Sequence, residues 1–324
     1  MFPSDTPGLE SLARRAFPAP LAVEALAGDV GRRRYFRLTL PDDRTAVGVV
    51  YPAEEEDARR RWVAARERLN GRVRVPALIA DDGRGNQLVE DFGRQDLAAR
   101  LAGVPGERAA WLGRAVDAAA AIAETPDPGI NPPFDAALFR RELDLAREAV
   151  FDLLLESPLP ASERAAHDAW AEALVEEVLS HPRALCHRDY HGNNLFPVGE
   201  DAAVIDFQDL RSGPDSYDLA SLLWERTTLT WMSAETARGV VERFASRRGV
   251  DAEAFTGRLE RVLLQRAWKV CGTFARAIVR GKGDLYRRYL PGELALVVGL
   301  LRGGAGETRF GDLLKVRCRG LLLS

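Results

Sequence analysis

The spacing of apolar residues changes near residue 93 of this 324-residue chain, and that change constrains the fold more than any other feature. Before it, apolar and polar residues alternate in YFRLTL, as is typical of a strand, and the segments RTAVGVVY and NQLVEDFG also predict strands. Beyond it, apolar residues recur mainly at helical spacing. We therefore predict an α+β fold with a small β-rich lobe over residues 1–92 and a larger helical lobe over residues 93–324.

Breaks in the pattern divide these lobes into elements. Helical spacing covers residues 9–27 and 53–70, and a Pro-rich break (PDPGINPPF) separates the first two long helical segments beyond residue 93. The segments ALCHRDYHGNNLF and AAVIDFQDL interrupt the helices as a short insert with strands. The predicted helices of the second lobe are residues 95–124, 134–156, 161–180, about 215–230, 233–247, 251–280 and 284–301.

Composition excludes several classes of protein. The net charge of -3 argues against nucleic acid as the main partner. The three cysteines, Cys186, Cys271 and Cys318, are far apart and predict neither a disulfide framework nor a zinc site. The apolar run 294–301 is far shorter than the roughly 20 residues of a bilayer span. We expect a cytoplasmic monomer that binds neither membrane nor nucleic acid.

Two segments carry residues with a shared chemical use. Residues 187–194 read HRDYHGNN, and residues 203–209 read AVIDFQD, an apolar strand that ends at Asp206. Phosphoryl transfer needs an aspartate that accepts a hydroxyl proton and oxygen ligands for the Mg²⁺ on the nucleotide phosphates. Asp189 suits the first role, and Asn194 and Asp206 suit the second. The alternative is that the residues of the first segment only close a tight turn.

These two segments, behind a sheet lobe and among helices, resemble the catalytic and metal loops of the protein-kinase-like superfamily, in its aminoglycoside phosphotransferase and choline kinase branch. The resemblance implies a two-lobed kinase-like fold, ATP as phosphoryl donor and Mg²⁺ as cofactor. In related folds the histidine at the position of His187 braces the loop, and we expect that structural role here.

A narrower resemblance covers about residues 28–291. The segments GDVGRRRYFRL, FDAALFRREL, GPDSYDLASLL and QRAWKVCGTFAR are similar to motifs of bacterial N-acetylmuramate/N-acetylglucosamine anomeric kinases. This likeness implies ATP-dependent phosphorylation of the anomeric hydroxyl of an N-acetylated amino sugar in cell-wall recycling. Two alternatives stay open: another acceptor, such as an aminoglycoside, choline or another sugar, or a catalytically silent nucleotide-binding protein.

One departure from the general kinase pattern concerns a lysine. Kinases carry a strand lysine on the nucleotide phosphates, but RTAVGVVYP offers none, and all but three of the 45 basic residues here are arginine. Arg32, Arg33, Arg34 and Arg37 lie in the loop expected to cover the phosphates. Because arginine can bond phosphate oxygens in a fork, we expect at least one of these four to do so. The alternative for each is a solvated hairpin.

The remaining site residues are assigned on weaker signals. In the hinge QLVEDFG, the backbone groups of Val89 and Asp91 are expected to contact adenine. Acidic or polar residues in otherwise apolar surroundings could bond acceptor hydroxyls, and a basic helix face could meet a lactyl carboxylate. The alternative for these residues is a purely structural role. These acceptor candidates are Glu142, His191, Asp209, Glu225 and Arg276.

Overall fold

The computed structural model describes residues 2–17, 22–26, 32–224, 228, 231–281 and 283–322. The chain forms two compact units. Unit 1 comprises Met1–Asn131 with Asp189–Leu210, and unit 2 comprises Pro132–Arg188 with Arg211–Ser324. The lobe boundary expected near residue 93 stays a prediction.

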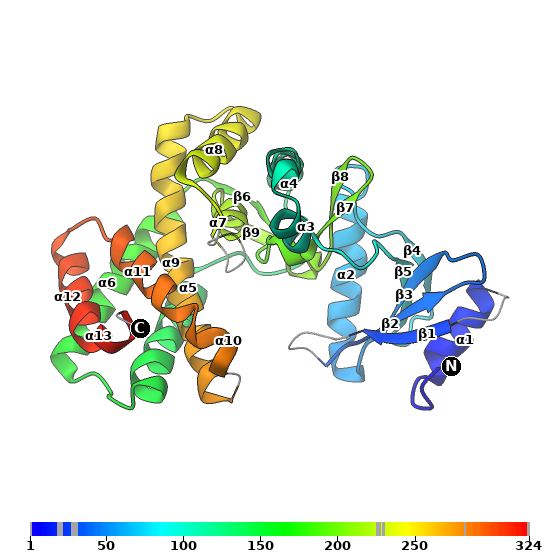
Figure 1. Ribbon diagram of the computed structural model, residues 1–324, viewed down its shortest axis with the longest axis horizontal. Helices are drawn as coiled ribbons and strands as arrows, with labels where there is room; N and C mark the ends of the chain where they lie inside the picture. Colours follow the sequence, from blue (N-terminus) through cyan, green and yellow to red (C-terminus); the bar gives the residue numbers. More distant parts are fainter. Residues whose placement is uncertain are drawn as a thin grey trace. The chain divides into compact units, whose positions relative to one another are not determined.

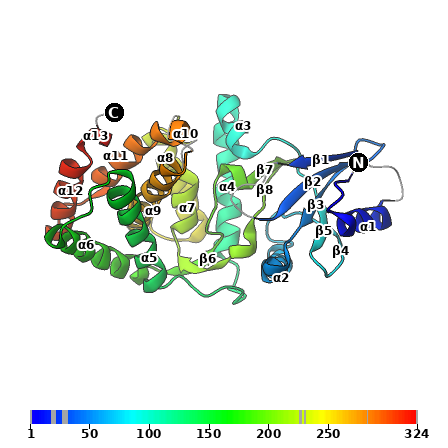
Figure 2. The ribbon, with the colours of Figure 1, turned by 90° about the horizontal axis from the view of Figure 1, so that it is seen from below.

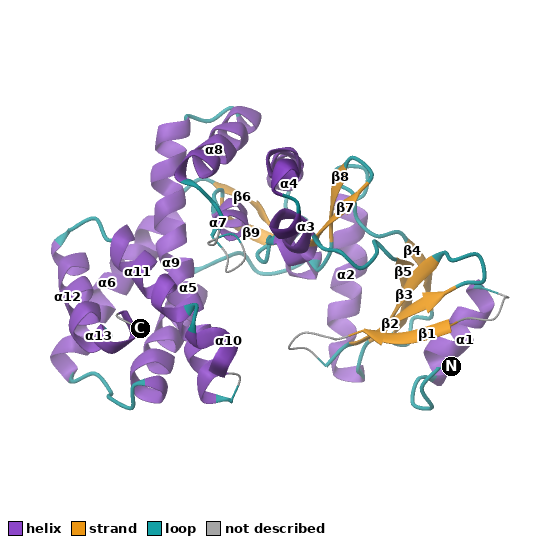
Figure 3. Ribbon diagram, in the orientation of Figure 1, coloured by secondary structure: helices purple, strands orange, loops and turns teal. Residues whose placement is uncertain are grey.

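Unit 1 contains a five-stranded antiparallel sheet with strand order β1-β2-β3-β5-β4 (Figure 3). Alternation in the sequence places Phe36 and Leu38 on the buried face of the second strand. The register pairs Phe36 with Gly48 and Val47 with Val89. The strands are β1 (Ala22–Leu26), β2 (Arg34–Thr39), β3 (Thr45–Val50), β4 (Leu78–Asp81) and β5 (Asn86–Glu90).

Helix α1 (Pro7–Ala16) covers one face of this sheet (Figure 2). Leu9 and Leu12 pack there with residues of β2 and β5 in one apolar core. The helix predicted over residues 9–27 is therefore too long, because residues 22–26 form strand β1 instead. The sequence places Pro18 and Pro20 between the two elements, and proline is not tolerated inside a helix.

The rest of unit 1 is mostly helical. Helix α2 matches the predicted segment 53–70, and its Trp62 stacks on Phe207 with ring centroids 5.4 Å apart. The segment predicted as one helix over residues 95–124 is two helices, with Pro105 between them. These elements are α2 (Glu56–Leu69), α3 (Leu97–Gly103), α4 (Arg108–Ala123), β7 (Leu195–Val198) and β8 (Asp201–Val204).

Unit 2 is built around helix α9 (Ala252–Val279), which packs against α5, α7 and α11 (Figure 1). Its Trp268 is fully buried in an aromatic cluster with Trp170 and Phe310. The other elements are α5 (Ala136–Arg147), a π-helical segment (Glu148–Leu154), α6 (Ala161–Ser180), β6 (Arg183–Cys186), β9 (Arg211–Pro214), α7 (Tyr217–Leu223), α8 (Ala234–Arg248), α10 (Gly283–Arg287), α11 (Leu290–Leu300), α12 (Ala305–Arg317) and α13 (Arg319–Leu322).

The predicted helices 233–247 and 251–280 are confirmed within one or two residues. Helices α12 and α13 were not predicted. Among the described residues, no helix is long and apolar enough to cross a bilayer.

Glu293 of α11 gives a prediction for stability against pH. Its side chain is buried, and that burial raises its pKa to about 7, with Arg266 opposing the rise. Between about pH 4.5 and pH 7 the folded chain therefore binds the extra proton, so stability falls as pH rises through this window. Such a pKa difference corresponds to at most about 3 kcal/mol. Above pH 7, Glu293→Gln is expected to be more stable than the wild type by up to about this amount, because glutamine places no charge in the buried site. Near pH 4.5 the two proteins should be equally stable.

Urea unfolding of both proteins at pH 5 and pH 8 measures this difference. A stability difference between Glu293→Gln and the wild type that stays the same at both pH values would contradict the assignment of a buried, neutral carboxyl group.

Candidate active site

The loop from Asp189 to Asn194 is closed by its own hydrogen bonds. The amide Nδ2 of Asn194 donates to the backbone oxygen of Asp189 at 2.9 Å, and the backbone N–H of His191 donates to the same oxygen at 3.1 Å. The backbone N–H of Asn194 in turn donates to the oxygen of His191 at 2.9 Å. Because Nδ2 of Asn194 is used in this way, its Oδ1 is the side-chain atom that could bind a metal ion.

The second segment is attached to this loop through the backbone. The N–H of Ile205, the residue after strand β8, donates to the backbone oxygen of Asn194 at 3.0 Å. Asp206 follows with φ +62° and ψ +35°, a left-handed conformation that aspartate and asparagine tolerate better than most residues. Asp189, Asn194 and Asp206 thus belong to one hydrogen-bonded arrangement within unit 1.

Three contacts fix the position of this loop in unit 1. The buried hydroxyl of Tyr190 donates to the backbone oxygen of Ala115 at 2.6 Å. The amide of Asn193 donates at 2.9 Å to the Asp96 carboxylate, which also caps α3. A side chain at Gly192 would lie 2.9 Å from Ala98, so this close approach requires glycine.

The chain immediately before Asp189 is held in unit 2 by Asp218. The carboxylate of Asp218 accepts hydrogen bonds from the backbone N–H groups of His187 at 2.6 Å and Arg188 at 2.9 Å. Burial raises the pKa of Asp218, whereas His187 and these hydrogen bonds oppose the rise. Arg188 has φ +81°, and Nη1 of Arg266 donates to its backbone oxygen at 3.2 Å. Asp218 therefore fixes a strained backbone next to the proposed base.

The carboxylate of Asp206 has contacts that suit a metal ligand. Its Oδ1 accepts a hydrogen bond from Nε2 of Gln208 at 2.8 Å, and its side chain is 40% exposed. Carboxylate and amide oxygens such as those of Asp206 and Asn194 are the ligands that Mg²⁺ prefers, completed by water and phosphate. The donor set therefore fits Mg²⁺, and Gln208, which sequence reasoning missed, orients the carboxylate.

The four arginines of the predicted phosphate loop have different surroundings. Nη1 of Arg32 pairs with exposed Glu54 at 2.7 Å, and Nη1 of Arg34 pairs with Asp5 at 2.5 Å. Arg33 alone among the four approaches Asp206, with Nη1 3.9 Å from Oδ1.

Arg37 lies buried on β2 and bonds to the hinge. Its Nε is 2.5 Å and its Nη2 3.0 Å from the Asp91 carboxylate, and Nη2 also donates to the oxygen of Gly93 at 2.7 Å. Burial alone would raise the pKa of Asp91, but the bonds from Arg37 and Gly93 hold it below its ordinary value. These contacts favour a structural role for Arg37 over the predicted phosphate contact.

The hinge residues differ in backbone environment. Val89 lies inside β5, where it is paired with Val47 of β3 and Leu78 of β4. The paired region of β5 ends at Glu90, so Asp91 is the first hinge residue beyond it. This placement favours the backbone of Asp91 over that of Val89 as the predicted adenine contact.

The acceptor candidates are divided between the units. Glu142 and Arg276 lie in unit 2, His191 and Asp209 lie in unit 1, and Glu225 lies outside the described residues. In α5, the Glu142 carboxylate is buried and contacts Nζ of Lys269 and Nε2 of Gln265, at 2.8 and 2.9 Å.

The pKa of Glu142 shows that its pairing outweighs its burial. Burial alone would raise this pKa, but Lys269 and Gln265 lower it below the ordinary value. Glu142 is thus ionised and held in place. Nη1 of Arg276 donates to the backbone oxygen of Leu145 at 3.1 Å.

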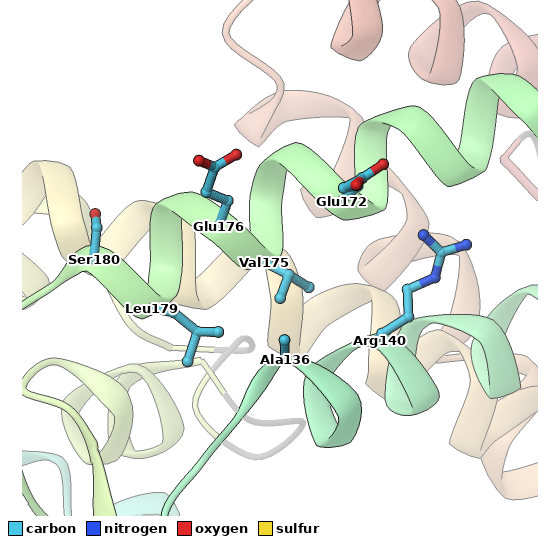
Figure 4. Close-up of a pocket in the computed structure, with 7 residues that line it drawn as sticks. All are labelled: Ala136, Arg140, Glu172, Val175, Glu176, Leu179 and Ser180. Atoms are coloured by element: carbon cyan, nitrogen blue, oxygen red, sulfur yellow. The ribbon is translucent and has the colours of Figure 1, made fainter.

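A surface hollow of about 700 Å³ lies on α5 and α6 of unit 2 (Figure 4). Within the described residues, none of the predicted site residues lines it. Its lining mixes two glutamates, one arginine and one serine with apolar side chains, and this set indicates no particular chemistry. The lining residues are Ala136, Arg140, Glu172, Val175, Glu176, Leu179 and Ser180.

Asp144, His167 and Asp168 bring possible metal-ligand atoms within 4.8 Å of one another in unit 2. Arg140 donates to both aspartates, at 3.1 and 2.6 Å. One guanidinium group therefore already bonds both carboxylates and offsets one of their two charges, which supports a structural role.

Comparison of the sequence with protein families matches residues 22–257 to the phosphotransferase enzyme family. The chain belongs to this family. The match covers most of the chain. It includes the Asp189–Asn194 loop and Asp206, so the proposed site of this phosphotransferase lies within the matched region.

Relatives of this phosphotransferase carry names that are more specific. The N-acetylmuramate/N-acetylglucosamine kinase of Pseudomonas aeruginosa is 31% identical over 286 residues, which cover 84% of this chain and 83% of the relative. The protein of the same name from Neisseria meningitidis serogroup B is 29% identical over 281 residues, covering 82% and 81%.

Solved structures confirm the fold class. The aminoglycoside phosphotransferase APH(2'')-Ib, bound to ADP, matches with a TM-score of 0.61 at 15% identity, covering 94% of this chain and 99% of that chain. A choline/ethanolamine kinase family protein from Mesorhizobium loti matches with a TM-score of 0.61 at 18% identity, covering 95% and 98%. The predicted α+β, protein-kinase-like fold is confirmed.

Proposed function

We propose that this phosphotransferase is an ATP-dependent sugar kinase that transfers the γ-phosphoryl group to the anomeric hydroxyl of N-acetylmuramate, N-acetylglucosamine or both, as part of cell-wall sugar recycling. The observation that carries the proposal is the named kinase of Pseudomonas aeruginosa, at 31% identity over 84% of this chain. The arrangement of Asp189, Asn194 and Asp206 supports the chemistry, because it offers one base and two oxygen ligands.

In this proposal Asp189 accepts or orients the proton of the acceptor hydroxyl. Asp218 bonds the backbone immediately before it, and its own backbone oxygen accepts bonds from Asn194 and His191, so the main chain that carries the carboxylate is held in place. An anomeric hydroxyl is more acidic than an ordinary alcohol, so the base has less to do. Positioning and charge stabilisation then supply most of the rate enhancement.

Asp206 and Asn194 would hold Mg²⁺ on the nucleotide phosphates. Bound Mg²⁺ neutralises the charge that develops on the phosphate oxygens during transfer. Gln208 keeps the Asp206 carboxylate oriented. Of the two predicted hinge residues, Asp91 rather than Val89 would present its backbone to adenine, because Val89 is paired on both sides within the sheet. Glu142, His191, Asp209, Glu225 and Arg276 remain candidate acceptor contacts.

A coupled ADP-release assay with a panel of acceptors tests the function. The panel is N-acetylmuramate, N-acetylglucosamine, glucosamine, glucose, kanamycin and choline, with Asp189→Asn as the inactive control. We expect turnover above the ATPase background with one or both N-acetylated sugars, and NMR of the product should place the phosphate on the anomeric oxygen.

The rival functions give different results in the same assay. Preferential turnover of kanamycin or choline would contradict the sugar assignment while leaving a phosphotransferase. ATP binding without transfer to any acceptor would favour a silent nucleotide-binding protein.

A further inference from the structure

Strand β3 (Thr45–Val50) provides no cation for the nucleotide phosphates. Its sequence TAVGVV contains no charged residue, so a positive charge must come from another element. Two consecutive arginines before β2 form ion pairs with two consecutive glutamates before α2. The pairs are Arg32 with Glu54, and Arg33 with Glu55.

The two ion pairs have the same chemistry but different environments. The side chains of Arg32 and Glu54 are 78% and 57% exposed, whereas those of Arg33 and Glu55 are 20% and 26% exposed. Solvent screens the first pair strongly, and such exposed pairs contribute little. The second pair is shielded, so its charges act more strongly on their surroundings.

Arg33 also lies next to the proposed metal ligand. Its Nη1 is 3.9 Å from Oδ1 of Asp206, and its Nε is 3.3 Å from the Glu55 carboxylate. The guanidinium carbon lies 6.0 Å from the centre of the buried Tyr51 ring. The Arg33 side chain is therefore held between a carboxylate at the start of α2 and the carboxylate that would hold Mg²⁺.

The charge of Arg33 persists in these surroundings. Arginine stays protonated in proteins, so its guanidinium is a permanent positive charge between the Glu55 and Asp206 carboxylates. The other arginines of the loop have partners elsewhere: Arg34 pairs with Asp5, and Arg37 pairs with Asp91.

We propose that Arg33, positioned by Glu55, binds the nucleotide phosphates in place of the strand lysine that kinases use. This inference rests on the proposed nucleotide-dependent function. From the sequence, any of four arginines could contact the phosphates, and the structure favours one of them. Glu55 is then a positioning residue, equivalent in purpose to the glutamate that pairs with that lysine. A guanidinium group can bond two phosphate oxygens at once, which an ammonium group cannot do in the same planar geometry.

Calorimetric binding of ATP, ADP and adenosine to four full-length variants tests the proposal. Arg33→Ala is expected to bind ATP and ADP about 10- to 100-fold more weakly than the wild type, as expected for loss of charged hydrogen bonds, and to bind adenosine unchanged. Arg32→Ala, the matched control from the exposed pair, should bind all three like the wild type. Glu55→Gln should weaken ATP binding less than Arg33→Ala, and Arg33→Lys should restore part of it.

The outcomes separate this inference from the proposed function. A wild type that binds no ATP would overturn both. A wild type that binds ATP, with Arg33→Ala equal to Arg32→Ala, would overturn only the role of Arg33. Equal losses for ATP and adenosine would also overturn it, because they would indicate structural damage. If Arg33→Ala does not fold, Arg33→Lys and Glu55→Gln test the proposal instead. Wild-type ATP affinity in both of these variants would contradict it.

Discussion

Replacing Asp189 by asparagine is expected to lower kcat for phosphoryl transfer by about 10²–10⁴-fold, the usual contribution of a positioned general base. Asparagine keeps the size of the side chain but cannot accept the hydroxyl proton. The bonds that close the loop use the backbone oxygen of Asp189 and should survive the substitution. ATP binding should therefore stay near the wild-type value. Steady-state kinetics with the best acceptor and calorimetric titration of ATP measure the two effects separately.

The matched control is Asp201→Asn, which makes the same chemical change at the exposed start of β8. It should leave both kcat and ATP affinity unchanged. Turnover of Asp189→Asn within a factor of a few of the wild type would contradict the assignment of Asp189 as the base.

The second large effect is expected at Asp206. Asp206→Asn should lower kcat/KM for ATP by at least about 10²-fold and raise the Mg²⁺ concentration needed for activity. Loss of even an outer partner of a metal ligand costs about 10- to 100-fold in metal affinity, and Asp206 would contact the metal directly. Asparagine is the appropriate replacement because it tolerates φ +62°, whereas alanine would add backbone strain to the loss of charge.

Asp43 offers an unusually close control for this experiment. It also has φ +62°, lies exposed in the turn between β2 and β3, and is outside the proposed site. Asp43→Asn makes the same substitution in the same backbone conformation, but away from the proposed metal ligands. Equal Mg²⁺ dependence of Asp206→Asn, Asp43→Asn and the wild type would contradict the role of Asp206.

The sequence predicts those elements whose structure is determined by residues close together in the chain. Helix α9 was predicted within two residues because its apolar spacing is continuous. The sequence does not predict strand β1, because apolar residues keep a helical spacing on both sides of Pro18 and Pro20 and so suggest one helix over residues 9–27. Helices α12 and α13 were missed because their apolar residues are interspersed with charges and glycines.

The same limit applies to the candidate site. The spacing of Asp189, Asn194 and Asp206 is local, and motif resemblance sufficed to select them. The partners of Arg33 and Arg37 are separated from them by 22 and 54 residues, so only the folded sheet brings each pair together. Glu55 had one available signal: it is an acidic residue at the start of the helix that follows β3.

The most direct test of the account is the binding of Mn²⁺, as a paramagnetic substitute for Mg²⁺, in the presence of ADP. Electron paramagnetic resonance of the free ion measures its affinity for the wild type, Asp206→Asn, Asn194→Ala and Asp43→Asn. We predict one tight nucleotide-dependent Mn²⁺ site in the wild type and in Asp43→Asn, weakened at least about 10-fold in the other two variants. Equal Mn²⁺ affinity in all four proteins would contradict a phosphoryl-transfer centre built on Asn194 and Asp206.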